Sequence, residues 1–261
     1  MKKVMAYSSK GGSGKSTGML IFCKEFSKKG YRVCLFDCDP QANLSKTLLK
    51  NRVFDEDYIS MADLFKRKVD PKMVKEAIEH VGENFDMIGS AMNLVDSERD
   101  VSTDLICDRA RVLEKIIKCI EDDYDLIFMD FNPYPSLLTT NGLIVSDFVV
   151  IPTTCDEWGA DGVAYTLSQI MEIEENIRYS PIPFKVLVNM KGRNNDDKQF
   201  QEDIESQLDD SQVFKTSIHY QAKPFRNKDE SVIDFKNGDT TVGQEWKSVI
   251  EELEREVVNN G

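Results

Sequence analysis

Six short apolar runs recur along the chain, and segments long enough for a helix separate most of them. Strands of a parallel sheet are covered on both faces, so they appear in a sequence as continuous apolar runs of this kind. The pattern therefore predicts an α/β fold in which a single doubly wound, mostly parallel sheet is flanked by helices. The runs are VMAYSS from Val4, YRVCLFD from Tyr31, FDMIG from Phe85, YDLIFMD from Tyr124, DFVVIPT from Asp147 and FKVLVNM from Phe184.

Helical spacing of apolar residues predicts the helices between these strands. The expected segments are residues 14–29, 103–121, 159–174 and 199–208, with Thr103 and Asp196 as candidate N-caps. Asp70 before Pro71 indicates a further helix that continues to about His80. The stretch GRNNDDK, residues 192–198, is typical of an exposed loop.

The last predicted helix, residues 242–258, has one apolar side and is expected to dock on the body of the fold. Residues 241–261 contain five glutamates against one lysine and one arginine, whereas helices on membrane surfaces are rich in basic residues. We therefore expect no membrane contact. There is no internal repeat and no long Pro/Gly/Ser linker, so residues 1–261 are expected to form one domain. A strand begins at about Lys2, and no helix-turn-helix extension is expected before it.

Composition indicates a globular protein, with 41% hydrophobic and 30% charged residues. The N-terminus lacks the long apolar run of a secretory signal, and no stretch approaches the roughly 18 apolar residues of a membrane span. A cytoplasmic protein is therefore expected. The six cysteines contain no C-x-x-C pair and are expected to be reduced and packed as small apolar groups. They are Cys23, Cys34, Cys38, Cys107, Cys119 and Cys155.

The net charge of −13 opposes attraction of the whole molecule to DNA or to anionic lipid. Two stretches depart from this trend, because residues 176–195 and 211–228 contain no acidic residue. Their basic residues are candidate contacts to DNA phosphates, although a solvated loop surface explains the same composition equally well. The candidates are Lys191, Arg193, Lys215, Lys223, Arg226 and Lys228.

The strongest chemical signal is SSKGGSGKST, residues 8–17, between a predicted strand and a predicted helix. In that context a glycine-rich loop wraps phosphate groups, because its N–H groups turn inward and the helix N-terminus points at them. Lys15 is expected to neutralise the β- and γ-phosphates, and the Ser16 hydroxyl to ligate Mg²⁺. The other nucleotide-binding positions are Gly11, Gly12, Ser13, Gly14 and Thr17.

Lys10 is a second lysine that the usual loop motif, G-x-x-x-x-G-K-[ST], does not require. Two ammonium groups at contact distance repel each other by about 1 kcal/mol in water. Lys10 is therefore expected to point outward until it meets a different phosphate. The pattern K-G-G-x-G-K-[ST] resembles the deviant nucleotide loop of the ParA/MinD family. This resemblance implies an ATP-dependent homodimer in which Lys10 reaches across to the ATP of the partner subunit.

Asp37 and Asp39 follow the second predicted strand in the segment DCDPQAN. Carboxylates at alternate positions of an extended chain point to the same side, so both can approach a Mg–nucleotide site. The segment resembles the D-x-D-P-Q-x-N element of ParA proteins. The resemblance implies that Asp39 positions or activates the attacking water and that Asp37 supports the Mg²⁺ shell.

Asp130 ends another predicted strand, where a Walker B carboxylate that helps to hold Mg²⁺ belongs. ParA proteins usually continue with D-x-P-P-S-L, whereas this chain reads DFNPYPSL. Asn132 replaces the first proline and Tyr134 stands at the position of the serine. The loop is expected to respond to the γ-phosphate with changed timing or partner contacts. Downstream, LTTNGLIVSDFVVIP resembles the family's L-x-x-N-A-L-x-A-A-D-x-V-L-I-P segment.

Two residues of the last third carry weaker signals. Asn189 ends the last predicted strand, beside which the adenine base lies in this class of proteins. It is either an adenine contact or an amide that caps its own turn. His219 has no acidic or serine partner that the sequence identifies as a triad, which argues against a nucleophilic hydrolase.

The resemblance covers nearly the full chain, most strongly over residues 1–50 and 124–162, and implies a DNA-partition ATPase. Such an enzyme would bind nonspecific DNA as an ATP·Mg²⁺ dimer associated with the nucleoid. A ParB-like centromere-binding partner would stimulate its weak hydrolysis. The main alternative is a MinD-like regulator acting at a membrane or on a protein, and the acidic C-terminus argues against it. An iron–sulfur reductase similar to NifH needs paired cluster cysteines, and a tyrosine kinase of this lineage needs a C-terminal tyrosine cluster; the sequence has neither.

Overall fold

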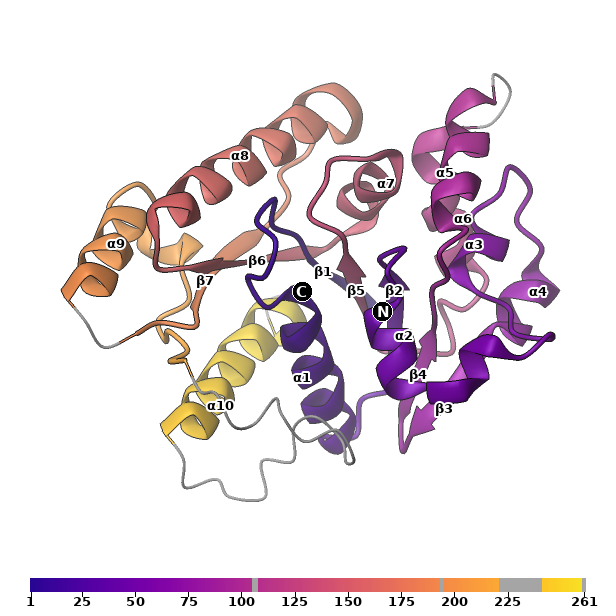
Figure 1. Cartoon of the computed structure of the whole chain (residues 1–261), viewed down its shortest axis with the longest axis horizontal. Helices are drawn as coiled ribbons and strands as arrows, with labels where there is room; N and C mark the ends of the chain where they lie inside the picture. The colour runs from indigo at the N-terminus through magenta and orange to yellow at the C-terminus, as the bar shows by residue number, and fades with distance from the viewer. Residues whose placement is uncertain (105–107, 193–194, 221–240, 260–261) are drawn as a thin grey trace.

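The structure is a computed structural model that describes residues 1–104, 108–192, 195–220 and 241–259. Within these residues seven strands form one sheet in the order β3-β4-β2-β5-β1-β6-β7. Neighbouring strands are parallel except for β3 and β4, which are antiparallel. This confirms the predicted fold class (Figure 1). The strands are β1 (Lys2–Ala6), β2 (Val33–Cys38), β3 (Ile78–Gly82), β4 (Phe85–Ile88), β5 (Leu126–Phe131), β6 (Phe148–Thr154) and β7 (Phe184–Asn189).

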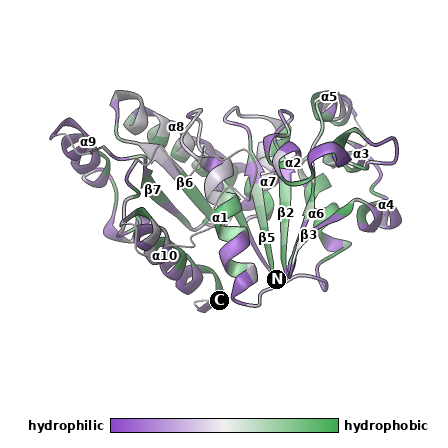
Figure 2. Cartoon of the chain, turned by 60° about the horizontal axis from the view of Figure 1, so that its bottom comes forward, coloured by the Kyte–Doolittle hydropathy of each residue, from purple (hydrophilic) through white to green (hydrophobic). Residues whose placement is uncertain are grey.

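Helices cover both faces of the sheet, whose strands are largely apolar in Figure 2. On one face α1 and α10 pack with Phe128 of β5, and on the other face α6, α7 and α8 pack with Met129 of the same strand. The helices are α1 (Lys15–Lys28), α2 (Asn43–Leu48), α3 (Met61–Leu64), α4 (Pro71–Glu76), α5 (Leu94–Thr103), α6 (Val112–Lys118), α7 (Leu137–Val145), α8 (Glu157–Ile173), α9 (Asn195–Glu205) and α10 (Thr241–Glu254).

Three local predictions are wrong. Thr103 is the last residue of α5 and not the cap of the next helix. Asp196 lies inside the first turn of α9, so part of the predicted loop at residues 192–198 is helical. Asp70 does cap α4 by accepting from the Lys72 N–H at 3.0 Å, but the helix ends at Glu76. The residues that follow form β3, because pairing with β4 at the edge of the sheet overrides the local helical pattern.

The C-terminal helix α10 docks on the sheet as predicted. Trp246 packs edge-on against Phe22 of α1, with ring centroids 5.9 Å apart. Below it, the buried ammonium of Lys185 on β7 contacts Glu252 at 2.6 Å and Glu256 at 3.0 Å. Paired charges of this kind tie the last helix to the strand at the end of the sheet. None of the helices in the described ranges is long and apolar enough to cross a bilayer.

Candidate functional site

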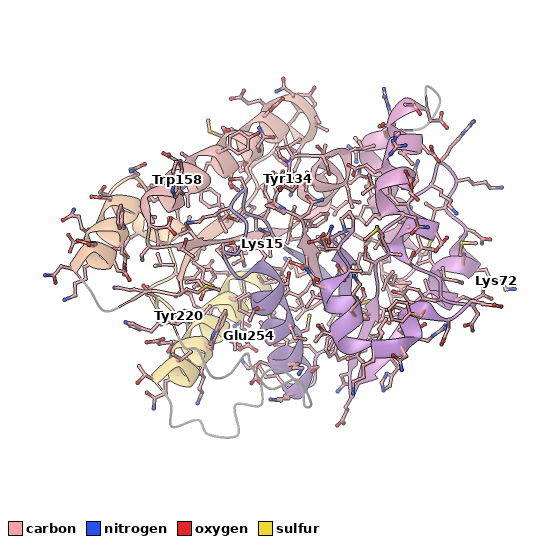
Figure 3. The ribbon with its side chains drawn as sticks, viewed as in Figure 1. Lys15, Lys72, Tyr134, Trp158, Tyr220 and Glu254 are labelled. Atoms are coloured by element: carbon pink, nitrogen blue, oxygen red, sulfur yellow. The ribbon has the colours of Figure 1, made fainter. Side chains whose placement is uncertain are left out.

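The candidate site lies where β1, β2 and β5 end at the same edge of the sheet. The register of β2 against β5 places Asp37 directly opposite Asp130. Adjacent strands are about 4.8 Å apart, so the two carboxylates are neighbours although they are far apart in the sequence. Beside these strand ends the loop after β1 lines a cleft of about 360 Å³. Lys15, one of the lining residues, lies near the middle of the molecule in Figure 3. The cleft is lined by residues 11–17 together with Asp39, Asn43, Phe131, Pro133 and Met190.

The loop of residues 8–17 has a backbone that only glycine adopts easily at two positions. Gly12 and Gly14 have φ of 75° and 91°, and Gly14 immediately precedes α1. Lys15 is buried, and its Nζ donates to the carbonyl oxygens of Ser8 and Lys10, each at 3.0 Å. Burial lowers the pKa of the Lys15 ammonium, while the charges of nearby carboxylates act in the opposite direction. The ammonium therefore lies inside the loop, where an anion would stabilise its charge.

Asp37 and Asp130 are both buried, but their oxygen atoms are used differently. Asp37 accepts from the N–H and hydroxyl of Ser45, at 2.9 and 2.6 Å, and from the Asp39 N–H at 3.2 Å. Asp130 lies within hydrogen-bonding reach of Ser16, yet its Oδ1 is buried and, among the described residues, has no partner. The hydrogen bonds of Asp37 thus close a turn. Asp130, by contrast, has one oxygen that could accept a hydrogen bond or bind a cation.

Burial raises the pKa of Asp130 to about 8, and the neighbouring charge of Asp37 adds to the shift. Burial also raises the pKa of Asp37 to about 6, although its hydrogen bonds from Ser45 oppose the effect. Two acids in one buried layer therefore disfavour each other's ionised form. A cation between the loop and Asp130 would relieve both costs.

These residues fit a Mg²⁺ ion that is bound together with a phosphate ligand. In the portion that the structure describes, no three acidic, histidine or cysteine side chains cluster into a metal cage. Mg²⁺ is commonly held by one or two protein oxygens, with phosphates and water completing its octahedron. The unpartnered Asp130 oxygen and the Ser16 hydroxyl oxygen are suitable Mg²⁺ ligands. Asp39 is half-buried at the mouth of the cleft, where its Oδ1 accepts from the Gln41 N–H at 2.8 Å.

Lys10 is turned back onto its own chain, which corrects the expectation that it points outward. Its Nζ donates to Thr154 Oγ1 at 2.5 Å and forms an ion pair with Asp156. Asp156 is also the N-cap of α8, because it accepts from the Trp158 N–H at 3.1 Å. An acidic partner within the chain offsets the repulsion from Lys15 that the sequence suggested.

The residue before Lys10 fixes the start of the loop on the same helix. The Ser9 N–H donates to Thr166 Oγ1 at 3.1 Å, and the Ser9 hydroxyl donates to the Gly162 carbonyl at 3.0 Å. Helix α8 therefore holds the beginning of the phosphate loop through two neighbouring residues. Trp158 of α8 and Tyr134 of the loop after β5 are exposed, and both are labelled in Figure 3.

Asn189 clasps the phosphate loop and also caps its own turn. Its Nδ2 donates to the Ser13 carbonyl at 2.9 Å, and its Oδ1 accepts from the Met190 N–H at 2.9 Å. A Cβ on Gly14 would lie 2.3 Å from this Nδ2, so glycine is required there for space as well as for φ. Both ends of the amide are engaged, and the next residue, Met190, lines the cleft.

The altered loop after β5 ends in a capping box. Tyr134 is 72% exposed and donates its N–H to Asn132 Oδ1 at 3.1 Å. Ser136, rather than Tyr134, supplies the hydroxyl that caps α7, accepting from the Thr139 N–H at 3.3 Å. In this loop the serine therefore stands two residues later than the ungapped family pattern places it.

Of the basic residues predicted to contact DNA, only Lys191 and Lys215 lie among those described; Lys191 contacts Gln201, and Lys215 is exposed. Arg193, Lys223, Arg226 and Lys228 lie outside the described residues, as does Cys107. His219 has an acidic partner that the sequence did not identify, Glu245 of α10, with Nδ1 and Oε1 2.6 Å apart. This pair fastens α10 and is separate from the cleft residues.

Sequence reasoning missed the partners of Lys10. Thr154 and Asp156 stand at the end of β6, far from the loop in the sequence. One local signal was present, because an aspartate directly before a helical pattern is a common N-cap. Ser45, which satisfies Asp37, carried no such signal.

A protein-family profile described as an AAA domain matches residues 1–180. The chain is also 28% identical over 221 residues to the sporulation initiation inhibitor protein Soj of Bacillus subtilis, a match that spans 84% of each protein. The chain belongs to the ParA family of P-loop ATPases. An uncharacterized protein of Methanocaldococcus jannaschii is 32% identical over 168 residues, and this ParA-family chain spans only 64% of that relative.

Solved structures agree with the ParA-family fold. A putative plasmid partition protein of Borrelia burgdorferi bound to AMPPNP has a TM-score of 0.78 and 23% identity, covering 97% of both chains. An ATP complex of a McdA variant from Cyanothece has a TM-score of 0.83 and 20% identity, covering 97% of this chain and 96% of that one. At these identities the likeness establishes the fold alone.

Proposed function

We propose that this chain is a partition ATPase whose ATP-bound homodimer binds DNA without sequence preference and releases it after hydrolysis. The observation that carries the proposal is Lys10, a second ammonium beside the phosphate loop that is held by Asp156 instead of entering the loop. The names of similar proteins also support a role in partition. One solved structure is a putative plasmid partition protein, and one relative is the chromosome-partitioning ATPase Soj of Treponema pallidum.

ATP and Mg²⁺ are the proposed cofactors. When bound, Mg²⁺ would neutralise phosphate charge and polarise the γ-phosphoryl group. Asp130 and Ser16 would hold it, while Asp37 keeps the turn that carries Asp39 in place. Lys15 and the N–H groups of the loop would bind the phosphates, and Asp39 would orient the attacking water.

Lys10 can change partners at low cost. The Asp156 side chain is 46% exposed, and ion pairs that water can reach contribute about 0.5–1 kcal/mol. A triphosphate carries several negative charges and offers a stronger partner in a water-poor interface. In the proposed dimer Lys10 would leave Asp156 for the nucleotide of the other subunit, so ATP itself would join the two chains.

The proposed dimer is tested with Lys10→Ala. This variant should still bind ATP, because Lys15 and the loop are intact, but should remain monomeric with ATP·Mg²⁺ in sedimentation velocity. Lys46→Ala is a matched control that removes an exposed lysine outside the cleft lining. An ATP-dependent dimer of Lys10→Ala would contradict the cross-subunit role.

The DNA switch is tested with Asp39→Ala, which should accumulate the ATP-bound dimer because hydrolysis is blocked. Binding to nonspecific duplex DNA is measured with ATP·Mg²⁺ and with ADP·Mg²⁺ at two salt concentrations. Salt-sensitive binding with ATP alone supports the partition ATPase. No binding in either state would favour a regulator that positions a protein assembly, as the name of a similar protein, maintenance of carboxysome distribution protein A, suggests. Turnover at the wild-type rate would contradict the role of Asp39.

A further inference from the structure

A groove of about 550 Å³ lies at the end of α1 that is farther from the nucleotide cleft. Its walls are the last turns of α1, the end of α2 and the turn between β3 and β4. Helix α1 begins beside the phosphate loop and runs 14 residues, so its two ends are about 20 Å apart. The groove is lined by Lys24, Ser27, Lys28, Gly30, Thr47, Leu48, Lys50, Val81, Gly82, Glu83, Asn84 and Phe85.

The lining of this groove is basic although the chain is strongly acidic. Lys24 and Lys28 are four residues apart on α1 and therefore share one face of the helix. Lys50 lies in the lining just after the end of α2, and Lys46 precedes it by four residues on α2. Residues 40–54 contain no aspartate or glutamate, a third acid-free stretch beside the two near the C-terminus. Glu83 is the one acidic residue in the lining.

Lys28 and Lys50 of the groove lining are available to an external anion, as is Lys46 beside them, unlike several neighbouring basic residues. Lys29, Arg32 and Arg52 are paired with Glu254, Asp125 and Glu79 respectively. Within the described residues, by contrast, Lys50 forms no salt bridge, and the exposed Lys46 donates to the carbonyl of Gln41. Lys28 pairs only with Glu25, its neighbour on the same exposed helix turn, and such a pair exchanges readily with solvent or a ligand.

We propose that this groove binds the phosphate backbone of DNA, an inference that rests on the proposed function. Lysines act as point charges that contact phosphate without reading bases, which suits binding without sequence preference. The groove is open and spans three elements, so it matches a continuous polyanion better than a single small anion. Its apolar lining residues, Leu48, Val81 and Phe85, are not exposed, which disfavours insertion into lipid.

This placement explains how ATP can control DNA binding without DNA entering the cleft. One groove with a few phosphate contacts binds weakly at physiological salt. Two grooves joined in one dimer bind the same duplex with a gain set by effective concentration. ATP would then act by joining two weak sites rather than by creating a new one.

The test uses the full chain with a nonhydrolysable ATP analogue and a nonspecific fluorescent duplex, titrated between 50 and 200 mM salt. The groove variant is Lys24→Gln/Lys28→Gln/Lys50→Gln. Its matched control is Lys66→Gln/Lys68→Gln/Lys72→Gln, which removes the same charge from exposed positions, of which Lys72 lies at the far edge of the molecule (Figure 3). Each phosphate contact contributes about 0.9 to the slope of log K against log salt, so the groove variant should lose about 2.7 per groove. The control should keep the wild-type slope, and a Lys→Arg triple in the groove should restore it.

The outcomes separate this inference from the proposed function. If wild type binds DNA and the groove variant keeps its slope, the groove is not the interface. If wild type binds no DNA with the analogue, the partition function fails and this inference with it. Loss of binding to anionic phospholipid vesicles in the groove variant, with DNA binding unchanged, would overturn the inference in favour of lipid. Analogue-dependent dimerisation of the variant, measured by sedimentation, shows that it is folded and binds nucleotide.

Discussion

Asp130→Asn should stabilise the nucleotide-free protein at alkaline pH while impairing Mg²⁺-dependent ATP binding. The carboxylate of Asp130 is buried with one vacant oxygen, and its pKa is raised from 3.8 to about 8. An acid whose pKa is higher in the folded state binds more protons there than in the unfolded chain. The contribution of Asp130 to the free energy of unfolding is therefore close to zero below about pH 4, and it becomes increasingly destabilising as the pH rises toward 8. The amide has the same shape and no charge to desolvate.

The size of the effect follows from the pH interval. Between pH 5 and 8 the folded state keeps its proton and the unfolded chain does not, which amounts to about 1.4 kcal/mol per pH unit, or about 4 kcal/mol in total. Asp37 ionises in the same interval, with a pKa of about 6. Part of the raised pKa of Asp130 therefore reflects the interaction between the two carboxylates and not Asp130 alone. We therefore expect Asp130→Asn to remove about half of this pH-dependent destabilisation, roughly 2 kcal/mol.

Urea unfolding of wild type and Asp130→Asn at pH 5, 6, 7 and 8, with chelator and without nucleotide, measures this difference. The free energy of unfolding of wild type should fall relative to the variant as pH rises. Groups elsewhere titrate in both proteins and cancel in the comparison. Adding ATP·Mg²⁺ at pH 8 should stabilise wild type much more than the variant. Parallel pH profiles in the absence of ligand would refute the assignment of Asp130 as an uncompensated buried acid.

Three further predictions concern the scaffold. Glu252→Ala should cost about 3 kcal/mol, because it removes a partner from the buried Lys185, whereas Glu252→Gln should cost less; thermal unfolding distinguishes them. Asn189→Ala should weaken ATP binding about fivefold by releasing the Ser13 carbonyl, with little loss of stability; calorimetric titration against wild type checks this, and unchanged affinity would show that the clasp is dispensable. Gly142→Ala should destabilise by about 1–3 kcal/mol, since its Cβ would lie 2.4 Å from the Phe131 ring; a wild-type urea midpoint would mean that the ring moves freely.

The sequence predicts those parts of the fold that depend on neighbouring residues. Buried strands of a parallel sheet are continuous apolar runs, so all but one of the strands stand out, and the glycine positions of the phosphate loop are set by local backbone needs. The edge strand β3 was missed because IEHVG is short and partly polar, and it becomes a strand only by pairing with β4.

The candidate site is predictable only in part, for a similar reason. Asp37, Asp39 and Asp130 each mark a strand end and could be placed at one edge of the sheet. Lys10 and Asp156 are 146 residues apart, and the chain offers 33 basic and 46 acidic residues from which to choose a pair. Charge alone does not select among them, because the pairing depends on where β6 delivers the start of α8.

The opposed positions of Asp37 and Asp130 have a consequence for how this ATPase can change state. Both stand on central strands whose ladder hydrogen bonds fix their spacing, so we expect the sheet beneath the cleft to open only when the whole fold unfolds. We therefore expect nucleotide to move only the segments around the cleft, namely the turn of Asp39, the loop of Tyr134 and the side chain of Lys10. A structure of the ATP state should superimpose on this sheet, with its differences confined to a rim of short, fast-moving segments. We expect the timing of the nucleotide cycle to depend on these exposed segments, which tolerate substitution more easily than the buried strands beneath them.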